Sequence, residues 1–386
     1  MNWTDYKLAE ISTNIQTGPF GSQLHQSDYS ECGTPVVMPK DLIAGHISED
    51  SIARVSEDHV ERLSRHKIEE GDILYSRRGD VGRCAYAGLK EVGWLCGTGC
   101  LRVSINAQIA NSKYVFYQLQ KAETVGWVVN HAVGATMLNL NTSILSDVPV
   151  KLPSLEIQNK TVRVLSAYDA LIENNQHQID LIEEAAQRLY KEWFVNLRFP
   201  GCEDLDIVDG IPTGWHIGTL SEIVEFRRGK TITKAQVKEG NVPVVAGGLE
   251  PAYYHNEANT KAPVITVSGS GANAGFSRMY HEDVFASDCS FADIQGTKCI
   301  SFVYCFLKAN KYQLDSLQKG SAQPHVYAKD INAMEMLIPQ SELIAHYCAK
   351  ADVLFNKIGV LQKQMAAASE ARDRLLPKLM SGEIEL

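Results

Sequence analysis

Two stretches of the chain, residues 151–194 and 337–380, carry the same pattern of apolar and polar positions. A shift of 186 positions lays the first stretch on the second, and each opens with an apolar residue followed by Pro153 or Pro339. The apolar stripe of the first stretch alternates spacings of three and four residues, through Leu165, Tyr168, Ile172, Asn175, Ile179, Ile182, Ala186, Leu189 and Trp193. The matching positions of the second are Ala351, Leu354, Ile358, Leu361, Met365, Ala368, Arg372, Leu375 and Leu379. This spacing predicts two matched amphipathic helices in a duplicated, two-module protein.

The two stripes are narrow and regular, so we expect the helices to pack on each other as a coiled coil. Two unrelated core helices are the alternative, but the matched spacing and length argue against it. Asn175 interrupts the first stripe and Arg372 the second. A buried Asn would fix the register, whereas an Asn at the solvated edge would not. The expected seam positions are Ile172, Asn175, Ile179, Ile182, Leu189, Ile358, Leu361, Met365 and Leu375. About 35 helical residues make a rod of about 50 Å, which we interpret as a spacer.

The segments before the helices repeat more weakly. Residues 3–11 align with 215–223 at an offset of 212, so the first module is longer than the second by 212 − 186 = 26 residues. Residues 71–76 and 264–268 are expected strands, each followed by a glycine-containing loop, at 77–83 and 269–275. The frame therefore repeats while its contents diverge, as expected of a scaffold that presents two different recognition surfaces.

Composition narrows the class of protein. The net charge of −9 argues against an indiscriminate nucleic-acid binder, and any phosphate contact must come from local basic clusters. Nine cysteines without a framework of close pairs favour reduced thiols over disulfides. No apolar run is long enough for a membrane helix and the first residues lack a signal-peptide pattern, so we expect a cytoplasmic protein.

Catalytic motifs are missing from the sequence. We find no HExxH, no GxSxG, no EF-hand loop, and no Asn/Asp-Pro-Pro-aromatic motif of adenine methyltransferases. The string Gly229-Lys230-Thr231 is not a phosphate-binding loop, because Val224 stands where that motif needs a glycine. We therefore expect a binding and assembly protein that is not itself an enzyme and holds no metal or cofactor.

Local strings now point to a family. TGPFGSQL (residues 17–24), GTPVVMPKDL (33–42), GDILYSRRGDVG (71–82), LPSLEIQ (152–158), AAQRLYKEWFV (185–195), GIPTGWHIGTLSEI (210–223) and LLPKLMSGEI (375–384) occur in this order. Their order and the duplication resemble the specificity subunit of type I restriction–modification enzymes. The resemblance covers essentially the whole chain.

The resemblance implies an α+β fold. Two mixed α/β target-recognition domains, residues 1–152 and 199–338, would be separated by two long helices, residues 153–198 and 339–386, with pseudo-two-fold symmetry. The helices should be antiparallel, because each leaves its own module and must end at the other.

The resemblance also implies the role. Each recognition domain would read one half of a split, asymmetric double-stranded DNA target. The helices would set the gap between the halves and dock two adenine-N6 methyltransferase subunits, and restriction subunits could join. S-adenosylmethionine, ATP and Mg²⁺ would belong to those partners. Because the chain is acidic, we expect tight DNA binding only together with the methyltransferase subunits.

Candidate DNA contacts follow from position and chemistry, since Arg and Lys suit phosphates or guanine edges and small polar residues suit base edges. In the first module they are Ser22, Gln23, Lys40, Arg77, Arg78 and Arg83. In the second they are Arg227, Lys230, Tyr253, Tyr254, His255, Ser270, Asn273, Gln323 and His325. Asn139 and His325 occupy equivalent places at the offset of 186.

Two other functions remain open at this point. A coiled-coil clamp could bridge two protein partners without reading DNA sequence. A fused restriction–methylation enzyme is the second alternative, against which the absent methyltransferase motif and the short length argue.

Overall fold

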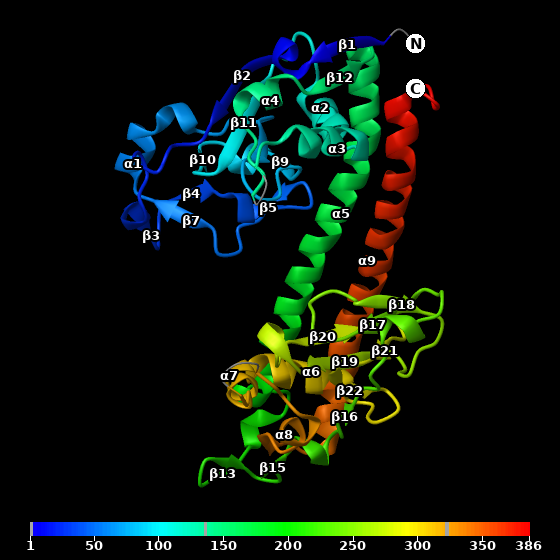
Figure 1. Ribbon diagram of the computed structural model, residues 1–386. Helices are drawn as coiled ribbons and strands as arrows, with labels where there is room; N and C mark the ends of the chain where they lie inside the picture. The colour runs from blue at the N-terminus through cyan, green and yellow to red at the C-terminus, as the bar shows by residue number, and fades with distance from the viewer. Residues whose placement is uncertain (1–2, 135–136, 321–323) are drawn as a thin grey trace. The chain divides into compact units, whose positions relative to one another are not determined.

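The structure, a computed structural model, describes residues 3–134, 137–320 and 324–386 (Figure 1). Packing divides the chain into two compact units. Unit 1 consists of Met1–Ala170 together with Ser369–Leu386, and unit 2 consists of Leu171–Ala368. Each unit therefore contains one mixed α/β body and one stretch of each long helix.

The body of unit 1 contains two four-stranded sheets. The first has the strand order β2 (Ser12–Thr17), β11 (Cys100–Ile105), β8 (Ile73–Ser76), β9 (Cys84–Tyr86) and is antiparallel. The second has the order β10 (Leu95–Cys96), β4 (Thr34–Val37), β7 (Ala53–Val55), β3 (Tyr29–Ser30). β1 (Thr4–Lys7) pairs with β12 (Pro149–Leu152), and β5 (Leu42–Ile43) with β6 (His46–Ile47). The helices are α1 (Glu57–Arg62), α2 (Ser112–Leu119), α3 (Ala122–His131) and α4 (Thr142–Ser146).

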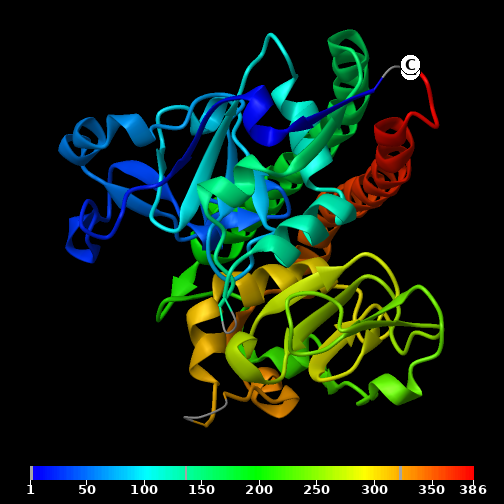
Figure 2. The same cartoon turned by 45° about the horizontal axis from the view of Figure 1, so that its top comes forward.

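The body of unit 2 repeats this plan with a shorter chain. Its antiparallel sheet has the order β16 (Arg227–Arg228), β22 (Cys289–Asp293), β19 (Val264–Ser268), β20 (Ser277–Tyr280). Its second sheet has the order β18 (Tyr253–His255), β17 (Val242–Val245), β21 (Phe285–Ala286). β15 (His216–Thr219) pairs with β23 (Glu335–Ile338), and β13 (Ile207–Val208) with β14 (Ile211–Pro212). The helices are α6 (Ile300–Ala309), α7 (Lys311–Ser316) and α8 (Ala328–Asn332); α6 packs on β19 and β20 (Figure 2).

Strand pairing shows that the duplication extends into the bodies. In unit 1, β1 pairs antiparallel with β12, the strand that precedes α5, and in unit 2, β15 pairs antiparallel with β23, the strand that precedes α9. In each unit one parallel pair, β4 with β10 or β17 with β21, leads directly into the central strand β11 or β22. The mixed α/β character predicted for both modules is confirmed.

The long helices are α5 (Leu155–Tyr190) and α9 (Ser341–Ser381). Helix α5 begins directly after Pro153, as expected: the carbonyl of Ser154 accepts its first backbone hydrogen bond, from Gln158. Gly382 follows α9 with a φ of 78°, the left-handed conformation that commonly ends a helix. A single π turn, Lys191–Val195, follows α5, and its Trp193 and Phe194 both enter the core of unit 2.

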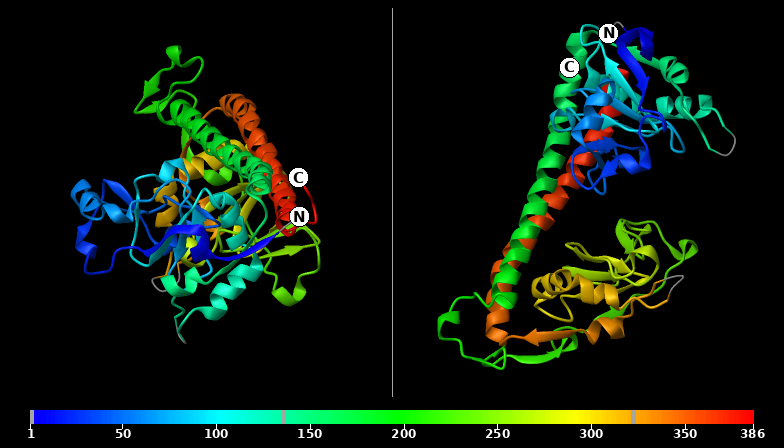
Figure 3. Two further views of the ribbon diagram at one scale, coloured as in Figure 1. Left: turned by 90° about the horizontal axis from the view of Figure 1, so that it is seen from above. Right: turned by 90° about the vertical axis from the view of Figure 1, so that its left-hand side faces the viewer.

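The two helices run antiparallel, as predicted (Figure 3). In unit 2 the hydroxyl of Tyr347 donates to the carbonyl of Ala186 over 3.3 Å. Also in unit 2, the Asn175 amide donates to the Gln364 side chain over 3.4 Å. Residue numbers rise along one helix as they fall along the other. Asn175 is only 3% exposed, so it lies in the helix interface and not at the solvated edge.

The predicted seam residues all lie on the covered side of the helices. Those that are buried are Asn175, Ile179, Ile358 and Leu361, and those that are half-buried are Ile172, Ile182, Leu189, Met365 and Leu375. The core of unit 2 includes Ile179, Ile358 and Leu361, whereas the end of α9 adds Leu379 and Met380 to the core of unit 1. Each helix thus begins in one unit and ends in the other.

Candidate nucleic-acid interface

The clearest candidate site occurs once in each unit, just after β8 in unit 1 and just after β19 in unit 2. There the chain forms an isolated antiparallel bridge with a distant loop, at Arg78 with Asn139 in unit 1 and at Ser270 with His325 in unit 2. We call these places bridge site 1 and bridge site 2. The expected equivalence of Asn139 and His325 is confirmed.

The backbone of the two bridge sites follows one hydrogen-bonding scheme. In bridge site 1 the Arg77 amide donates to Gly99 over 2.8 Å, and its carbonyl accepts from Leu140 over 2.8 Å. In bridge site 2 the Gly269 amide donates to Asp288 over 3.3 Å, and its carbonyl accepts from Val326 over 3.1 Å. The glycines after β2 and β16 match as well, because Gly18 and Gly229 donate to Cys100 and Cys289. The scaffold therefore presents different side chains from equivalent backbone positions.

Bridge site 1 is rich in hydrogen-bond donors. Arg78 is exposed, and the guanidinium carbon of Arg77 lies 5.7 Å from the centre of the Phe20 ring. Three of its buried polar atoms, Arg77 Nε, Thr98 Oγ1 and Asn139 Oδ1, have no hydrogen-bond partner among the described residues. Such atoms cost about 1–3 kcal/mol each when nothing satisfies them. Buried polar atoms normally have a protein, water or ligand partner, so these three atoms can accept or donate to a polar group from outside the protein.

Bridge site 2 is a cavity of about 380 Å³. Its polar lining includes Arg228, Ser270, Asp288 and His325. The Ser270 hydroxyl donates to Asp288 Oδ2 over 2.5 Å. The His325 ring stacks on Tyr327 with 6.0 Å between the ring centres. This site therefore combines the exposed cation Arg228 with a half-buried carboxylate, Asp288.

The other predicted residues of unit 1 lie on the surface with partners of their own. Ser22 is exposed, and the Gln23 side chain accepts from Arg65 over 3.4 Å. Lys40 donates to the Ser51 carbonyl over 2.7 Å. The Arg83 guanidinium forms an ion pair with Asp80 at 2.9 Å, which neutralises part of the charge that it could offer to a phosphate.

In unit 2 two predicted residues serve the fold. His255 is 7% exposed, and its Nδ1 accepts the backbone N–H of Lys238, so the ring is not offered to a partner. Arg227 donates to the buried Asp293 over 3.1 Å and covers the Phe291 ring. These two side chains therefore stabilise the body of unit 2.

The remaining predictions in unit 2 lie closer to solvent. Lys230 and Tyr254 are exposed and Tyr253 is half-buried, while the Asn273 amide donates to the Gly247 carbonyl over 3.4 Å. Gln323 lies outside the described residues. Sequence reasoning did not select Arg228, Thr98 or Asp288 as contacts. Thr98 and Asp288 lie in the short links before β11 and β22 and carry no recognisable motif.

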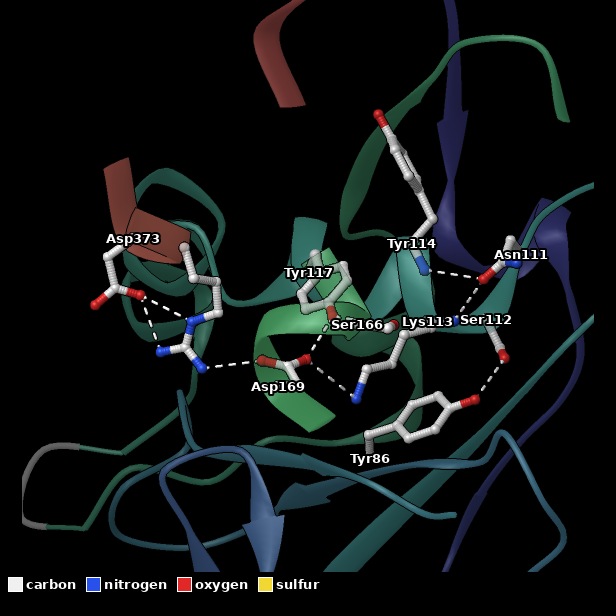
Figure 4. Close-up of polar contacts among 10 residues, drawn as sticks. Tyr86, Asn111, Ser112, Lys113, Tyr114, Tyr117, Ser166, Asp169 and Asp373 are labelled. Carbon is white, nitrogen blue, oxygen red and sulfur yellow. Dashed lines mark hydrogen bonds and ion pairs between the residues drawn. The ribbon is translucent and has the colours of Figure 1, made fainter. Parts of the chain in front are cut away.

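A polar junction holds the body of unit 1 on the long helices (Figure 4). Asp169 on α5 accepts from the Tyr117 hydroxyl over 2.5 Å and from Arg372 on α9 over 3.0 Å. Lys113 of α2 lies 3.8 Å from the same carboxylate. Burial and the bond to Asp169 raise the pKa of Tyr117, so its hydroxyl stays protonated and donates. Arg372, the polar residue in the apolar stripe of α9, thus forms an ion pair with Asp169 of α5.

The described residues contain no group of three or more His, Cys, Asp or Glu side chains placed to hold a metal ion. All nine cysteines are free thiols. Within the described ranges no helix has both the length and the apolarity needed to cross a membrane.

Comparison with known proteins gives one consistent result. The family described as "Type I restriction modification DNA specificity domain" matches residues 1–184 and 212–360. The MjaIX specificity subunit of Methanocaldococcus jannaschii is 26% identical over 308 residues, which cover 71% of this chain and 69% of that protein. The HindI specificity subunit of Haemophilus influenzae is 22% identical over 99% of this chain and 100% of its own. The crystal structure of the S subunit of a type I restriction–modification system from M. genitalium has a similar fold, with a TM-score of 0.61 at 18% identity over 98% of this chain and 96% of that one.

Proposed function

Because the chain belongs to the family of type I restriction–modification specificity subunits, we propose that it reads a bipartite, asymmetric DNA target for a methyltransferase complex. Unit 1 reads one half of the target and unit 2 the other. The chain itself catalyses nothing. S-adenosylmethionine, ATP and Mg²⁺ serve the partner subunits, and the complex works in the cytoplasm, where the DNA is.

The observation that carries this proposal is the pair of bridge sites. One backbone scheme holds arginines and unsatisfied polar atoms in unit 1, and a serine, a carboxylate and a histidine in unit 2. Base edges in the major groove differ in their pattern of donors and acceptors. Two equivalent sites with unlike donors and acceptors are suited to two unlike half-sites.

The helices act as the spacer in this proposal. The 36 residues of α5 span about 54 Å at 1.5 Å per residue. Half-sites read from one side of a duplex are separated by about 34–36 Å, one helical turn, or a multiple of it. The helix pair is long enough to fix such a separation and still anchor both bodies.

A repeated surface motif supports the docking of two methyltransferase copies. Glu184 and Arg188 of α5 form an ion pair at 2.7 Å, and Glu370 and Arg374 of α9, at the offset of 186, form one at 2.6 Å. All four side chains are more than 60% exposed. The flanking apolar residues repeat too, Ala185 with Ala371 and Leu189 with Leu375.

Glu184, Ala185 and Arg188 are exposed, so core packing does not account for their repetition, whereas Leu189 and Leu375 belong to the seam. The buried residues Ala186 and Trp193 correspond to Arg372 and Leu379 in the second copy, so these positions have diverged. Around Leu189 the motif borders an apolar hollow of about 400 Å³ that Leu181, 50% exposed, also lines. A patch displayed twice, once on each helix, suits two copies of one partner.

The experiment combines the purified chain with its adenine methyltransferase and a pool of randomised DNA duplexes. We expect the complex to contain two methyltransferase copies and to select one split motif. The chain alone, with its net charge of −9, should bind DNA weakly at physiological salt. A complex that assembles but selects no motif would favour the alternative, a coiled-coil clamp between protein partners.

Docking is tested separately with charge reversals. Arg188→Glu and Arg374→Glu should each remove one methyltransferase copy, and the double variant should remove both, as measured by native mass spectrometry. Lys160→Glu is the control, because Lys160 forms a similar ion pair on α5 with Glu156 at 3.1 Å outside the repeated motif. Two copies retained on the double variant would exclude this docking surface.

A further inference from the structure

Bridge site 2 contains a carboxylate, Asp288, beside the cation Arg228. Asp288 of bridge site 2 occupies the short link between β21 and β22. The matching link of unit 1, between β10 and β11, contains Gly97, Thr98 and Gly99 and no carboxylate. In the proposed function both positions face DNA, where a carboxylate needs a specific role.

The backbone holds Asp288 firmly. Its carbonyl accepts from Gly269 over 3.3 Å, and the preceding Ser287 donates to Val245 over 2.8 Å, so both sheets of the body fix the link. Ser270 donates to Oδ2 over 2.5 Å and orients the carboxylate. Among the described residues no Lys, Arg or His nitrogen forms an ion pair with Asp288, although Arg228 lines the same cavity. Oδ1 is therefore available to a donor from outside the protein.

A carboxylate near DNA is repelled by the phosphates, and it gains energy only from a hydrogen-bond donor on a base. In the major groove the exocyclic amino groups are N4 of cytosine and N6 of adenine. Adenine places the acceptor N7 beside N6, which repels a second carboxylate oxygen, whereas cytosine has no acceptor beside N4 on that edge. A carboxylate, which accepts but cannot donate, thus favours cytosine over adenine in the major groove.

On this basis, and resting on the proposed function, we propose that Asp288 reads the amino group of a cytosine in the half-site bound by unit 2. Ser270 is the positioning residue that holds Oδ2 and leaves Oδ1 to accept from the base. Arg228 lowers the repulsion between the carboxylate and the nearest phosphates. Unit 1 lacks a counterpart of Asp288, so this cytosine preference belongs to one half of the target.

The test is a selection from randomised duplexes with the complete complex of the chain and its methyltransferase subunits. The wild-type complex should require cytosine at one position of one half-site. With Asp288→Asn the Ser270 hydroxyl holds one end of the amide, so the base meets either a neutral oxygen or an NH2 donor in place of a carboxylate oxygen. The preference for cytosine over adenine at that position should fall by about tenfold to a hundredfold, with all other positions unchanged.

Two variants locate and control the effect. Asp315→Asn makes the same charge change in α7, where Asp315 forms an ion pair with Lys311 at 2.5 Å, and should leave the motif unaltered. Arg78→Ala in bridge site 1 should relax a position in the opposite half of the target. Ser270→Ala gives an independent measurement, because loss of its hydroxyl should weaken the preference at the position that Asp288→Asn alters.

The outcomes separate the two proposals. If the wild-type complex selects no motif, the proposed function fails and this inference with it. If the wild type selects a split motif but Asp288→Asn and Ser270→Ala both leave every position unchanged, only the assignment of Asp288 is overturned. A change confined to the half that Arg78→Ala also alters would overturn it as well.

Discussion

The junction at Asp169 gives the most direct prediction about stability. Its carboxylate side chain is 14% exposed. It accepts a charge-assisted hydrogen bond from Arg372 over 3.0 Å and a short one from the Tyr117 hydroxyl over 2.5 Å. A hydrogen bond to a charged group contributes about 1.5–3 kcal/mol, against about 0.5–1.5 kcal/mol for a neutral one. Asp169→Asn keeps the shape, but the amide has a single oxygen, so it accepts from only one of the two donors and its NH2 group faces the other. Loss of one bond to the charged carboxylate costs about 1.5–3 kcal/mol, so we expect a loss of about 2 kcal/mol.

The loss should be local to unit 1. Arg372 keeps a second partner, Asp373 at 2.9 Å, which limits the cost of removing the charge of Asp169. Urea unfolding followed by circular dichroism measures the free energy of unfolding. Hydrogen exchange assigns the loss to α2, the start of α5 and the end of α9. Residues of unit 2 should keep their protection, because each unit has its own core.

A matched control and a double-mutant cycle test whether the loss comes from the bonds to Asp169. Asp180→Asn changes the same residue type on an exposed face of α5, where its hydrogen bond comes from Gln176, and should cost less than about 0.5 kcal/mol. Tyr117→Phe combined with Asp169→Asn should show a coupling of about 1 kcal/mol. If Asp169→Asn proves no more destabilising than Asp180→Asn, the junction does not hold unit 1 on the helices.

Two further predictions concern titration. Burial and the charge of Lys363 lower the pKa of His281 to about 4, so the folded protein keeps the ring neutral while the unfolded chain binds a proton near pH 6.5. Stability from this group is present above pH 6.5 and is lost as the pH falls toward 4. It amounts to about 1–2 kcal/mol after allowance for solvent, and His281→Gln should flatten the pH profile of urea unfolding by that amount; an unchanged profile would contradict it. The hydrogen bond with Cys348 lowers the pKa of Cys299 to about 7, so iodoacetamide should label Cys299 with a half-maximal rate near pH 7, and labelling only above pH 8.5 would refute this pairing.

The sequence alone determined the frame of this protein. The spacing of apolar residues predicted both long helices, since a helix depends on residues three and four positions apart. Their antiparallel direction followed from connectivity, because each helix leaves one module and must reach the other. The family was recognisable because seven short sequence strings occur in a characteristic order along a duplicated chain.

Only the tertiary structure decided the chemistry of the sites. Asp288, Arg228 and His325 come together through strand pairing between segments far apart in sequence, which no local pattern reports. His255 and Tyr254 are neighbours in one short strand, yet one is buried and the other 57% exposed, because alternate side chains point to opposite faces. Packing also decided the place of Asn175. Its spacing marked it as a polar residue in the apolar stripe, but only packing against α9 placed it inside the helix interface.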